Sequence, residues 1–403
     1  MAFYYTHLSR RGKQRYGGIM KRIFITLILV GGILAGTAFF FRDWFTRQAF
    51  APTQRTVSQP GFVPAEEETG VPDSKEENIT TIAQDLSIPW EIAFLPGGDL
   101  LVTERPGRLL RIGQDKQVIP VNGVRHVGEG GLLGLALHPD FASNNFVYLY
   151  LTTTAGSGLT NRVERYVLSG NELSGRTVIL EHIPGAQFHD GGRIAFGPDE
   201  KLYITTGDAG TEANAQNRES LAGKILRLND DGSIPMDNPF KTAIWSYGHR
   251  NPQGITWDED GNLWATEHGR SGTASGFDEV NLIKPGKNYG WPTIEGDATA
   301  SGMETPKANS GAKETWAPSG AAYLDGSIYF AGLRGEALYE AAIDGTNIPT
   351  IKAHLAGEFG RLRTVAVGPD GFLYILTSNK DGRGVVKPSD DKIIRINPEL
   401  LKS

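Results

Sequence analysis

The sequence predicts an all-β fold, a six-bladed β-propeller whose blades are four-stranded antiparallel sheets. One hairpin pattern recurs six times between residues 92 and 379: a β-rich run, a turn containing Pro, Asp, Asn or Gly, and a second β-rich run. Successive copies are spaced widely enough to leave room in each period for two more strands. Gly makes up 51 of 403 residues without a collagen-like period, as expected for many tight turns. Six such four-stranded units form a propeller.

The N-terminal segment, residues 1–77, lies outside this repeat and is predicted to export and tether it. Residues 1–22 are a basic tail, and residues 23–41 contain no charge over 19 positions, close to the length that spans a membrane. Because six Lys or Arg precede this apolar run, the tail is expected in the cytoplasm and the body outside it, as a periplasmic or cell-surface domain on a transmembrane helix. The alternative is a cleaved signal peptide and a secreted protein. Residues 42–77, rich in Pro, Gln, Glu and Ser, are expected to be a flexible linker before the propeller at 78–403.

Within the propeller, each copy of the hairpin is expected to supply the first two strands of a blade. The copies begin at Ile92, Leu135, Ile194, Ile255, Ala321 and Val365. Two further strand-like runs, 79–83 and 393–396, stand at opposite ends of the repeat region. We expect these two runs to pair and close the ring, because closure removes the exposed sheet edges.

Composition excludes several function classes. The absence of Cys excludes thiolate metal sites, a Cys nucleophile, disulfides and covalent haem attachment through Cys. Positions 1–50 hold eight basic residues and one acid, so residues 51–403 hold 32 basic and 45 acidic residues, a net charge of −13. A body this acidic argues against nucleic acid as a partner. The sequence also contains no nucleophile elbow, HExxH pair, Walker loop or dinucleotide fingerprint.

The repeat register predicts where a site lies. The first strand of each blade lines the central channel, so residues just before it, and residues just after the antiparallel second strand, gather at one end of the channel. Polar residues fill these positions where stability alone asks only for turn formers. They are Glu129, His189, Arg250, Asn251, the segment 316–319, Arg361 and Arg363 before first strands, and Glu104, Arg105, Asp208, the segment 267–269, Leu333, Arg334, Ser378 and Asn379 after second strands. This ring predicts a polar site at the channel mouth.

The residue types indicate the chemistry of that site. Four arginines, at 250, 334, 361 and 363, can bind a polyanion through bidentate carboxylate pairing. His189 is the natural general base near neutral pH, and Asp208 can orient it or bind a hydroxyl. Glu279 is a hard oxygen ligand suited to Ca²⁺, although with Asp278 it can equally be a solvated pair. Trp291 is more typical of core packing than of a substrate platform.

Several long motifs, in this order, resemble the glucose/sorbosone dehydrogenase family. They are EGGLLGLALHPDF, HDGGRIAFGPDEKLYITTGD, LAGKILRLNDDGSIPMDNPF, GHRNPQGI and DEVNLIKPGKNYGWP, and the resemblance runs from about residue 88 to residue 396. The closer match is to the aldose sugar dehydrogenases of that family, which use pyrroloquinoline quinone (PQQ). The family's six-bladed propeller agrees with the repeat count, and its tricarboxylate cofactor accounts for the arginines.

The resemblance implies a role for each matching residue. His189 would take the proton from the sugar C1 hydroxyl while the C1 hydride passes to PQQ, giving a lactone, with Arg250 stabilising charge on the cofactor and Asp208 a substrate-side acid. Cofactor contacts would come from Glu129, Arg250, Asn251, Ala317, Pro318, Ser319, Leu333, Arg334, Arg361 and Arg363. One Ca²⁺ would polarise the quinone through main-chain carbonyls at Gly269 and Arg270, and a structural Ca²⁺ would take Glu279 and the Tyr289 carbonyl.

Two departures from the family pattern bear on specificity. The glucose-oxidising branch carries Gln where this chain has Glu129 and Lys where it has Arg334. The chain also lacks that branch's longer loops and dimer-forming segments, so we expect a monomer with a broad aldose range. Because no haem motif is present, the electrons must pass to a separate acceptor, expected to be a membrane quinone or a cytochrome. Two other classes stay open: a Ca²⁺-dependent lactonase-type hydrolase and a non-catalytic binding propeller.

Overall fold

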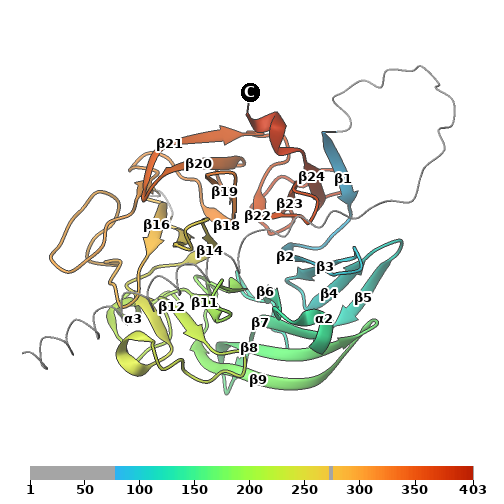
Figure 1. Cartoon of the computed structure of the whole chain (residues 1–403), viewed down its shortest axis with the longest axis horizontal. Helices are drawn as coiled ribbons and strands as arrows, with labels where there is room; N and C mark the ends of the chain where they lie inside the picture. The colour runs from blue at the N-terminus through green and yellow to red at the C-terminus, as the bar shows by residue number, and fades with distance from the viewer. Residues whose placement is uncertain (1–77, 272–275, 403) are drawn as a thin grey trace, which may run out of the picture. The chain divides into compact units, whose positions relative to one another are not determined.

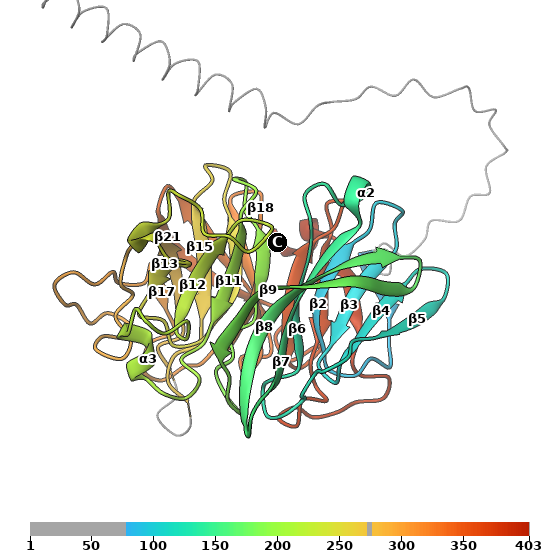
Figure 2. The same ribbon diagram turned by 90° about the horizontal axis from the view of Figure 1, so that it is seen from below.

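Six four-stranded antiparallel sheets surround a central channel in the computed structural model, which describes residues 78–271 and 276–402. Figure 1 looks along the channel and Figure 2 shows the same blades from the side. The expected all-β six-bladed propeller is therefore confirmed. The expected tail, anchor and linker fall outside the described residues. Within the described ranges, no helix is long and apolar enough to cross a membrane.

The chain builds the blades in order, each from its innermost strand outward. The first blade contains β2 (Pro89–Phe94), β3 (Leu100–Glu104), β4 (Arg108–Ile112) and β5 (Lys116–Pro120), and the second contains β6 (Leu132–Leu137), β7 (Phe146–Ala155), β8 (Gly158–Ser169) and β9 (Glu172–Pro184). The third contains β10 (Ile194–Phe196), β11 (Leu202–Thr206), β12 (Lys224–Leu228) and β13 (Ile244–Tyr247), and the fourth contains β14 (Pro252–Trp257), β15 (Leu263–Glu267), β16 (Glu279–Ile283) and β17 (Ala308–Asn309). The fifth contains β18 (Pro318–Leu324), β19 (Ser327–Gly332), β20 (Leu338–Asp344) and β21 (Asn347–His354).

The sixth blade joins the two ends of the repeat region. Its strands are β22 (Leu362–Val367), β23 (Leu373–Thr377), β24 (Ile393–Ile396) and, on the outside, β1 (Ile79–Ala83). β1 pairs antiparallel with β24, and Ile79 lies opposite Ile396. The predicted ring closure is thus confirmed. Short helical segments occur only in the connections of the described chain: α2 (Phe141–Asn144), α3 (Ala213–Gln216), η1 (Pro239–Lys241) and η3 (Pro398–Leu401).

All six predicted hairpins form the inner strand pairs. In the first and third blades, for example, Ile92 pairs with Val102 and Ile194 with Ile204. Apolar side chains on both faces of these strands pack against the neighbouring blades. The result is six buried clusters, each centred on the junction between two adjacent blades. Because every blade buries both of its faces, burial of apolar area stabilises the whole ring rather than one layer.

The inner strands converge closely around the channel. A Cβ on Gly134 of β6 would collide with the Gly192 carbonyl oxygen, and a Cβ on Gly254 of β14 would collide with the Ser319 carbonyl oxygen. Glycine is therefore required where neighbouring inner strands approach each other. From one end the channel is open as a cavity of about 410 Å³ lined by the six inner strands. The other end carries the loops that the repeat register singled out.

Candidate active site

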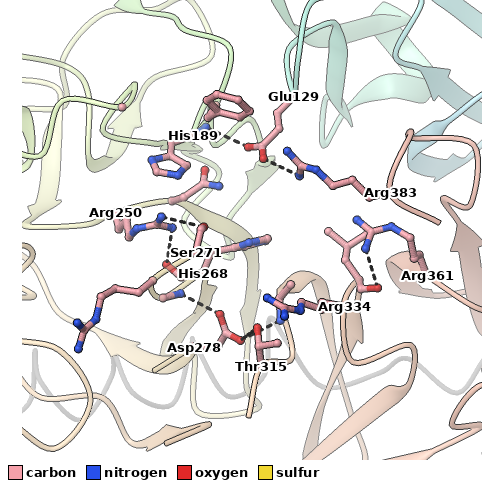
Figure 3. A pocket seen from close by; sticks show the side chains of 17 residues that line it. Glu129, His189, Arg250, His268, Ser271, Asp278, Thr315, Arg334, Arg361 and Arg383 are labelled. Atoms are coloured by element: carbon pink, nitrogen blue, oxygen red, sulfur yellow. Dashed lines mark hydrogen bonds and ion pairs between the residues drawn. The ribbon is translucent and has the colours of Figure 1, made fainter. Parts of the chain in front are cut away.

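A cavity of about 510 Å³ lies among the loops before the inner strands and after the second strands. Side chains from at least five blades reach it, and Figure 3 shows them converging. Propeller topology therefore brings together positions as distant in the sequence as Glu129 and Arg361. Of the residues named from sequence, those that line this cavity are Glu129, His189, Arg250, Asn251, His268, Gly269, Arg270, Asp278, Ala317, Leu333, Arg334 and Arg361.

His189 is held by a buried carboxylate. Its Nδ1 lies 2.8 Å from Oδ1 of Asp208, which also accepts the Gly210 N–H at 2.8 Å. Trp291 Nε1 donates to the other oxygen of Asp208 at 2.9 Å. Because a carboxylate only accepts hydrogen bonds, the Nδ1 of His189 carries the proton and Nε2 keeps its lone pair. An imidazole in this state can act as a general base.

Trp291 lies at the site, not in the core where its residue type alone would place it. Its ring centroid is 5.3 Å from the guanidinium carbon of Arg250, close enough for a cation–π contact. Trp291, His189, Asp208 and Arg250 also line a side cavity of about 270 Å³ next to the main one. The pair of cavities therefore offers room on both sides of the His189 and Arg250 side chains.

The arginines make the cavity cationic. Arg250 is 6% exposed and donates to the Ser271 hydroxyl at 3.0 Å, while Arg361 is paired with Asp381 at 2.8 Å and donates to the Leu333 carbonyl at 3.1 Å. Burial lowers the pKa of Arg250 from its ordinary value, which favours an anion beside it. Sequence reasoning did not include Arg383, which also lines the cavity. The loop that contains Arg383 also holds Lys380 and Lys387. Its only sequence signal is that it follows the second strand of its blade, a position that the repeat register places at the channel mouth.

Three of the predicted cofactor contacts lie just beneath the cavity instead of lining it. Pro318 and Ser319 begin β18, and Arg363 is one residue inside β22. Arg363 NH1 donates to Gln253 Oε1 at 2.8 Å, and the same oxygen accepts from the Ser319 hydroxyl at 3.1 Å. Burial, and then the nearby charge of Arg105, lower the pKa of Arg363 to about 9. Among the described residues its buried Nε has no hydrogen-bond partner, so a cationic group beneath the cavity is left partly unsatisfied.

The predicted metal ligands divide between two places. Gly269 and Arg270 line the main cavity, and Gly269, Glu279 and Tyr289 also border a small cavity behind it, together with Glu267. Burial, and then the charge of Glu267, raise the pKa of Glu279 to about 8. Glu267 and Glu279 face each other as paired residues of β15 and β16. Across the described residues, no group of three or more acidic or His side chains has metal-binding geometry.

Two buried carboxylates fasten the loops of the site: Glu267, which the repeat register placed at the channel mouth, and Asp278, which sequence reasoning named only beside Glu279 as part of a possible solvated pair. Oδ2 of Asp278 accepts the N–H groups of Trp316 and Ala317 at 2.6 and 2.9 Å, and Oδ1 accepts the N–H of Gly269 at 2.9 Å. Glu267 accepts the N–H groups of Arg250 and Asn251 in the same way. These acids therefore hold cofactor-facing segments by their main chain. No sequence pattern distinguishes them from solvated acids, because their partners are backbone groups of neighbouring loops.

His249 and His268 are the remaining histidines near the site. His249 is fully buried, where it lies 2.9 Å from Glu267 and 2.8 Å from the Ser246 hydroxyl and stacks on Tyr289. It supports Glu267 and does not reach the cavity. His268 lines the cavity, and burial lowers its pKa to about 4, so this imidazole is neutral at pH 7. Its buried Nε2 has no hydrogen-bond partner in the described part of the chain, which leaves one polar atom of the cavity wall unsatisfied there.

Comparison with known proteins identifies this architecture. The model of the Glucose / Sorbosone dehydrogenase family matches residues 86–394. The PQQ-bound aldose sugar dehydrogenase of Streptomyces coelicolor is 44% identical, with a TM-score of 0.74, over 79% of this chain and 97% of that one. The aldose sugar dehydrogenase YliI of Escherichia coli K12 is 32% identical over 76% of this chain and 91% of its own. Quinoprotein glucose dehydrogenase B of Acinetobacter calcoaceticus is 34% identical over 64% of this chain and 59% of its own.

Fold, cavity and relatives together define an enzyme, an oxidoreductase built on a six-bladed propeller with its site at one channel mouth. The family match covers well over half of the chain. The chain belongs to the glucose/sorbosone dehydrogenase family, as its motifs indicated.

Proposed function

We propose that the protein oxidises aldose sugars at C1 to the lactone with PQQ as cofactor. The observation that carries this proposal is a His–Asp pair, His189 and Asp208, in a cavity walled by arginines from several blades. A hydrolase needs no such concentration of cations, and a binding propeller needs no imidazole with a free Nε2. The relatives that are aldose or glucose dehydrogenases support the substrate class.

The residues present fit PQQ, a planar tricarboxylate. Arg250, Arg334 and Arg361 line the cavity, and Arg363 with its unsatisfied Nε lies directly beneath it. Guanidinium groups suit carboxylates because they bind them in a bidentate manner. When bound, PQQ would supply the two-electron acceptor for the hydride from C1. Asn251, Ala317 and Leu333 would complete the cofactor contacts from the cavity wall, and Pro318 and Ser319 would support them from below.

The chain's own residues would manage the proton and the charge. Nε2 of His189 takes the proton of the C1 hydroxyl as the C1 hydrogen leaves with its electron pair, and a C1 carbonyl, the lactone, results. Asp208 stabilises the imidazolium through the 2.8 Å contact with Nδ1. Arg250 is fixed by Ser271 and by Trp291, so it offers a preorganised positive charge where negative charge develops.

Ca²⁺ also fits the donor set behind the cavity. Glu279 is a buried carboxyl whose pKa is raised to about 8, first by burial and then by the charge of Glu267. A divalent cation there would replace that proton, with Glu279 and the Tyr289 carbonyl as ligands. A second Ca²⁺ at the carbonyls of Gly269 and Arg270 would lie at the cavity wall. The observation that supports the first site is the chemistry of two facing buried carboxylates.

This calcium site predicts a pH-dependent stability. The folded-state pKa of Glu279, about 8, lies above its ordinary value of 4.5, so the unfolded chain releases a proton that the folded chain keeps. Its stabilising contribution is therefore complete below about pH 4.5 and is lost as the pH rises through 8. In EDTA, the melting temperature should fall from pH 5 to pH 8, and Ca²⁺ should raise it more at pH 8 than at pH 5. Differential scanning calorimetry measures both effects.

The matched control for that experiment is Glu279→Gln, which keeps the side-chain size and removes the titration. In EDTA, the melting temperature of this variant should fall less between pH 5 and pH 8 than that of the wild type. The increase in melting temperature caused by Ca²⁺ should also no longer depend on pH. If Ca²⁺ stabilises the wild type and E279Q equally at both pH values, Glu279 is not a calcium ligand.

The remaining proposals concern the surroundings of the enzyme. Residues 23–41 would anchor the propeller on the outer side of a membrane, or act as a signal peptide that releases it. A separate quinone or cytochrome would take the electrons, since the chain contains no Cys for covalent haem attachment. The enzyme would act as a monomer. N-terminal sequencing of the native protein distinguishes the anchor from the cleaved peptide.

One experiment tests the proposed activity against its rivals. Residues 78–403 are purified, PQQ and Ca²⁺ are added, and dye reduction is followed with glucose or xylose. We expect PQQ-dependent reduction and a lactone product. Absence of both PQQ binding and dye reduction would reject the proposal, and lactone hydrolysis without PQQ would favour the lactonase alternative.

A further inference from the structure

The backbone of His189 has a conformation that its residue type disfavours. Its φ is +62°, in the left-handed region that L-residues other than Gly rarely adopt. Such a conformation persists only where neighbouring groups hold it. Besides the contact between Nδ1 and Asp208, two groups hold its main chain: the Ala209 N–H donates to the His189 carbonyl at 3.2 Å, and a carboxylate accepts the His189 N–H. The groups that bind the main chain therefore help to decide where the imidazole lies.

Glu129 binds that main chain directly. Its Oε2 accepts the N–H of His189 at 3.0 Å, and its own N–H donates to the Gln187 carbonyl at 2.9 Å. Glu129 thus clasps the segment 187–189 with both its backbone and its side chain. The loop of Glu129 is itself fixed, because Arg105 donates to the Gly128 carbonyl. The contact is well shielded, since the Glu129 side chain is 20% exposed.

Two other blades use the same kind of contact at the start of an inner strand. Ala317, with φ +45°, donates its N–H to Asp278 at 2.9 Å, and Ile88, with φ +52°, donates its N–H to Asp391 at 3.3 Å. Both residues immediately precede an innermost strand, β18 and β2. A buried carboxylate from the preceding blade thus holds a left-handed residue at the start of an inner strand. Glu129 occupies that role in front of β10.

The second oxygen of Glu129 has an unusual partner. In the other two clasps, main-chain N–H groups of the carboxylate's own blade bind the remaining oxygen: Gly269 for Asp278 and Asn379 for Asp391. Oε1 of Glu129 instead pairs with Arg383 NH1 at 2.8 Å, from a loop of the sixth blade 254 residues away. Figure 3 shows the Arg383 guanidinium next to the Glu129 carboxylate. Although burial would raise it, the pKa of Glu129 is lowered to about 2 by the His189 N–H and Arg383.

We propose that Glu129 is a positioning residue that holds His189 in its working geometry, and that Arg383 acts through Glu129 by restraining it from the sixth blade. This inference rests on the proposed role of His189 as the base. It differs from a direct role of the Glu129 charge toward the cofactor or the sugar. The two roles are separable, because positioning needs only an oxygen that accepts a hydrogen bond, whereas a charge effect needs the carboxylate.

A pair of substitutions at Glu129 separates them. Glu129→Gln keeps an oxygen for the His189 N–H, so kcat should stay within about 5-fold of the wild type. Glu129→Ala removes the acceptor, and kcat should fall about 100-fold through misplacement of the base. A fluorescence titration of PQQ in both variants shows separately whether the cofactor site changes, because Glu129 lines the cavity and is itself an expected cofactor contact. The proposal is overturned if E129Q loses as much kcat as E129A, or if E129A keeps the wild-type kcat.

Arg383 is tested by a double-mutant cycle. Its side chain is 51% exposed, so the ion pair is weak and Arg383→Gln should lower kcat by at most about 5-fold. In the E129Q background, the same substitution should have no effect, because Arg383 acts only through the Glu129 carboxylate. Equal losses in both backgrounds would contradict this part of the proposal and would place Arg383 in direct contact with substrate or cofactor.

Hydrogen–deuterium exchange provides a readout that needs neither PQQ nor sugar. In the cofactor-free protein, E129A should speed exchange of the His189 amide, and R383Q should speed it less; R383Q keeps the test available should E129A fail to fold. Asp391→Asn is the matched control, which should affect the Ile88 amide and leave His189 unchanged. Unchanged His189 exchange in both E129A and R383Q would overturn the proposal. If exchange changes as expected but the wild type neither binds PQQ nor oxidises aldoses, the proposed function fails while the clasp itself stands.

Discussion

Replacement of His189 by asparagine is expected to lower kcat about 1000-fold without weakening PQQ binding. A positioned general base contributes roughly 10² to 10⁴ in rate, and within the described residues His189 has the one imidazole that lines the cavity with Nδ1 held by a carboxylate. Asparagine is chosen because it tolerates the left-handed backbone at this position better than alanine does. The loss is measured by steady-state dye reduction and by a PQQ titration of the same preparation.

Asp208→Asn tests the same His189–Asp208 pair by changing the carboxylate instead of the imidazole. Three donors surround the two carboxylate oxygens: His189 Nδ1 and the Gly210 N–H at Oδ1, and Trp291 Nε1 at Oδ2. An amide must turn its NH₂ toward one side. If it faces His189, Nδ1 must accept, Nε2 carries the proton, and the base is lost. We expect a fall in kcat of about 100-fold or more.

Two results would contradict this assignment. Turnover retained by H189N would remove His189 as the base. Loss of PQQ binding in H189N would mean that His189 contributes to the cofactor site itself, so that the lower rate would not report on proton transfer. His249→Asn is the comparison, since this buried histidine supports Glu267 and should lower stability rather than kcat of the folded enzyme.

The fold was predictable because its signal is local. Each inner hairpin, such as the one from Ile194, shows alternating apolar residues around a tight turn within one short segment, and six copies determine the ring. Propeller topology then places residues before the inner strands at the mouth, which is why His189, Arg250 and Arg361 could be expected to meet. The outer strands were harder to predict from the sequence; β17, for example, has only two residues.

The different depths of the predicted contact residues follow from the same geometry. Residues two apart on a strand share a face but lie further along it by about 6 to 7 Å, so Arg361 reaches the cavity while Arg363 lies beneath it. The clasps by Glu129, Asp278 and Asp391 could not be predicted. They depend on left-handed backbones at His189, Ala317 and Ile88, which are not glycines and carry no turn signature.

The Asp278 clasp leads to the second large effect, a loss of stability. Four donors converge on this carboxylate, which is 1% exposed: the N–H groups of Gly269, Trp316 and Ala317, and the Thr315 hydroxyl. Each buried donor left without an acceptor costs about 1–3 kcal/mol. Because water from the cavity can reach some of them, we expect Asp278→Ala to lower the free energy of unfolding by about 3–5 kcal/mol, measured by urea denaturation.

The same substitution should weaken PQQ binding at least about 10-fold, and this outcome decides between two opposing effects. Asp278 lines the cavity, so removal of its charge alone should favour an anionic cofactor. Loss of the Asp278 side chain also releases the main chain at Ala317 and Gly269, two segments of the cavity wall. We expect the resulting disorder to outweigh the change in charge.

Asp278→Asn can keep its oxygen toward Trp316 and Ala317 and turn its NH₂ toward Gly269, so its stability loss should be about 1–3 kcal/mol. Thr315→Val removes only one donor and should cost still less. Tighter PQQ binding by D278A would show that the charge of Asp278, and not its hold on the two segments, governs the cofactor site.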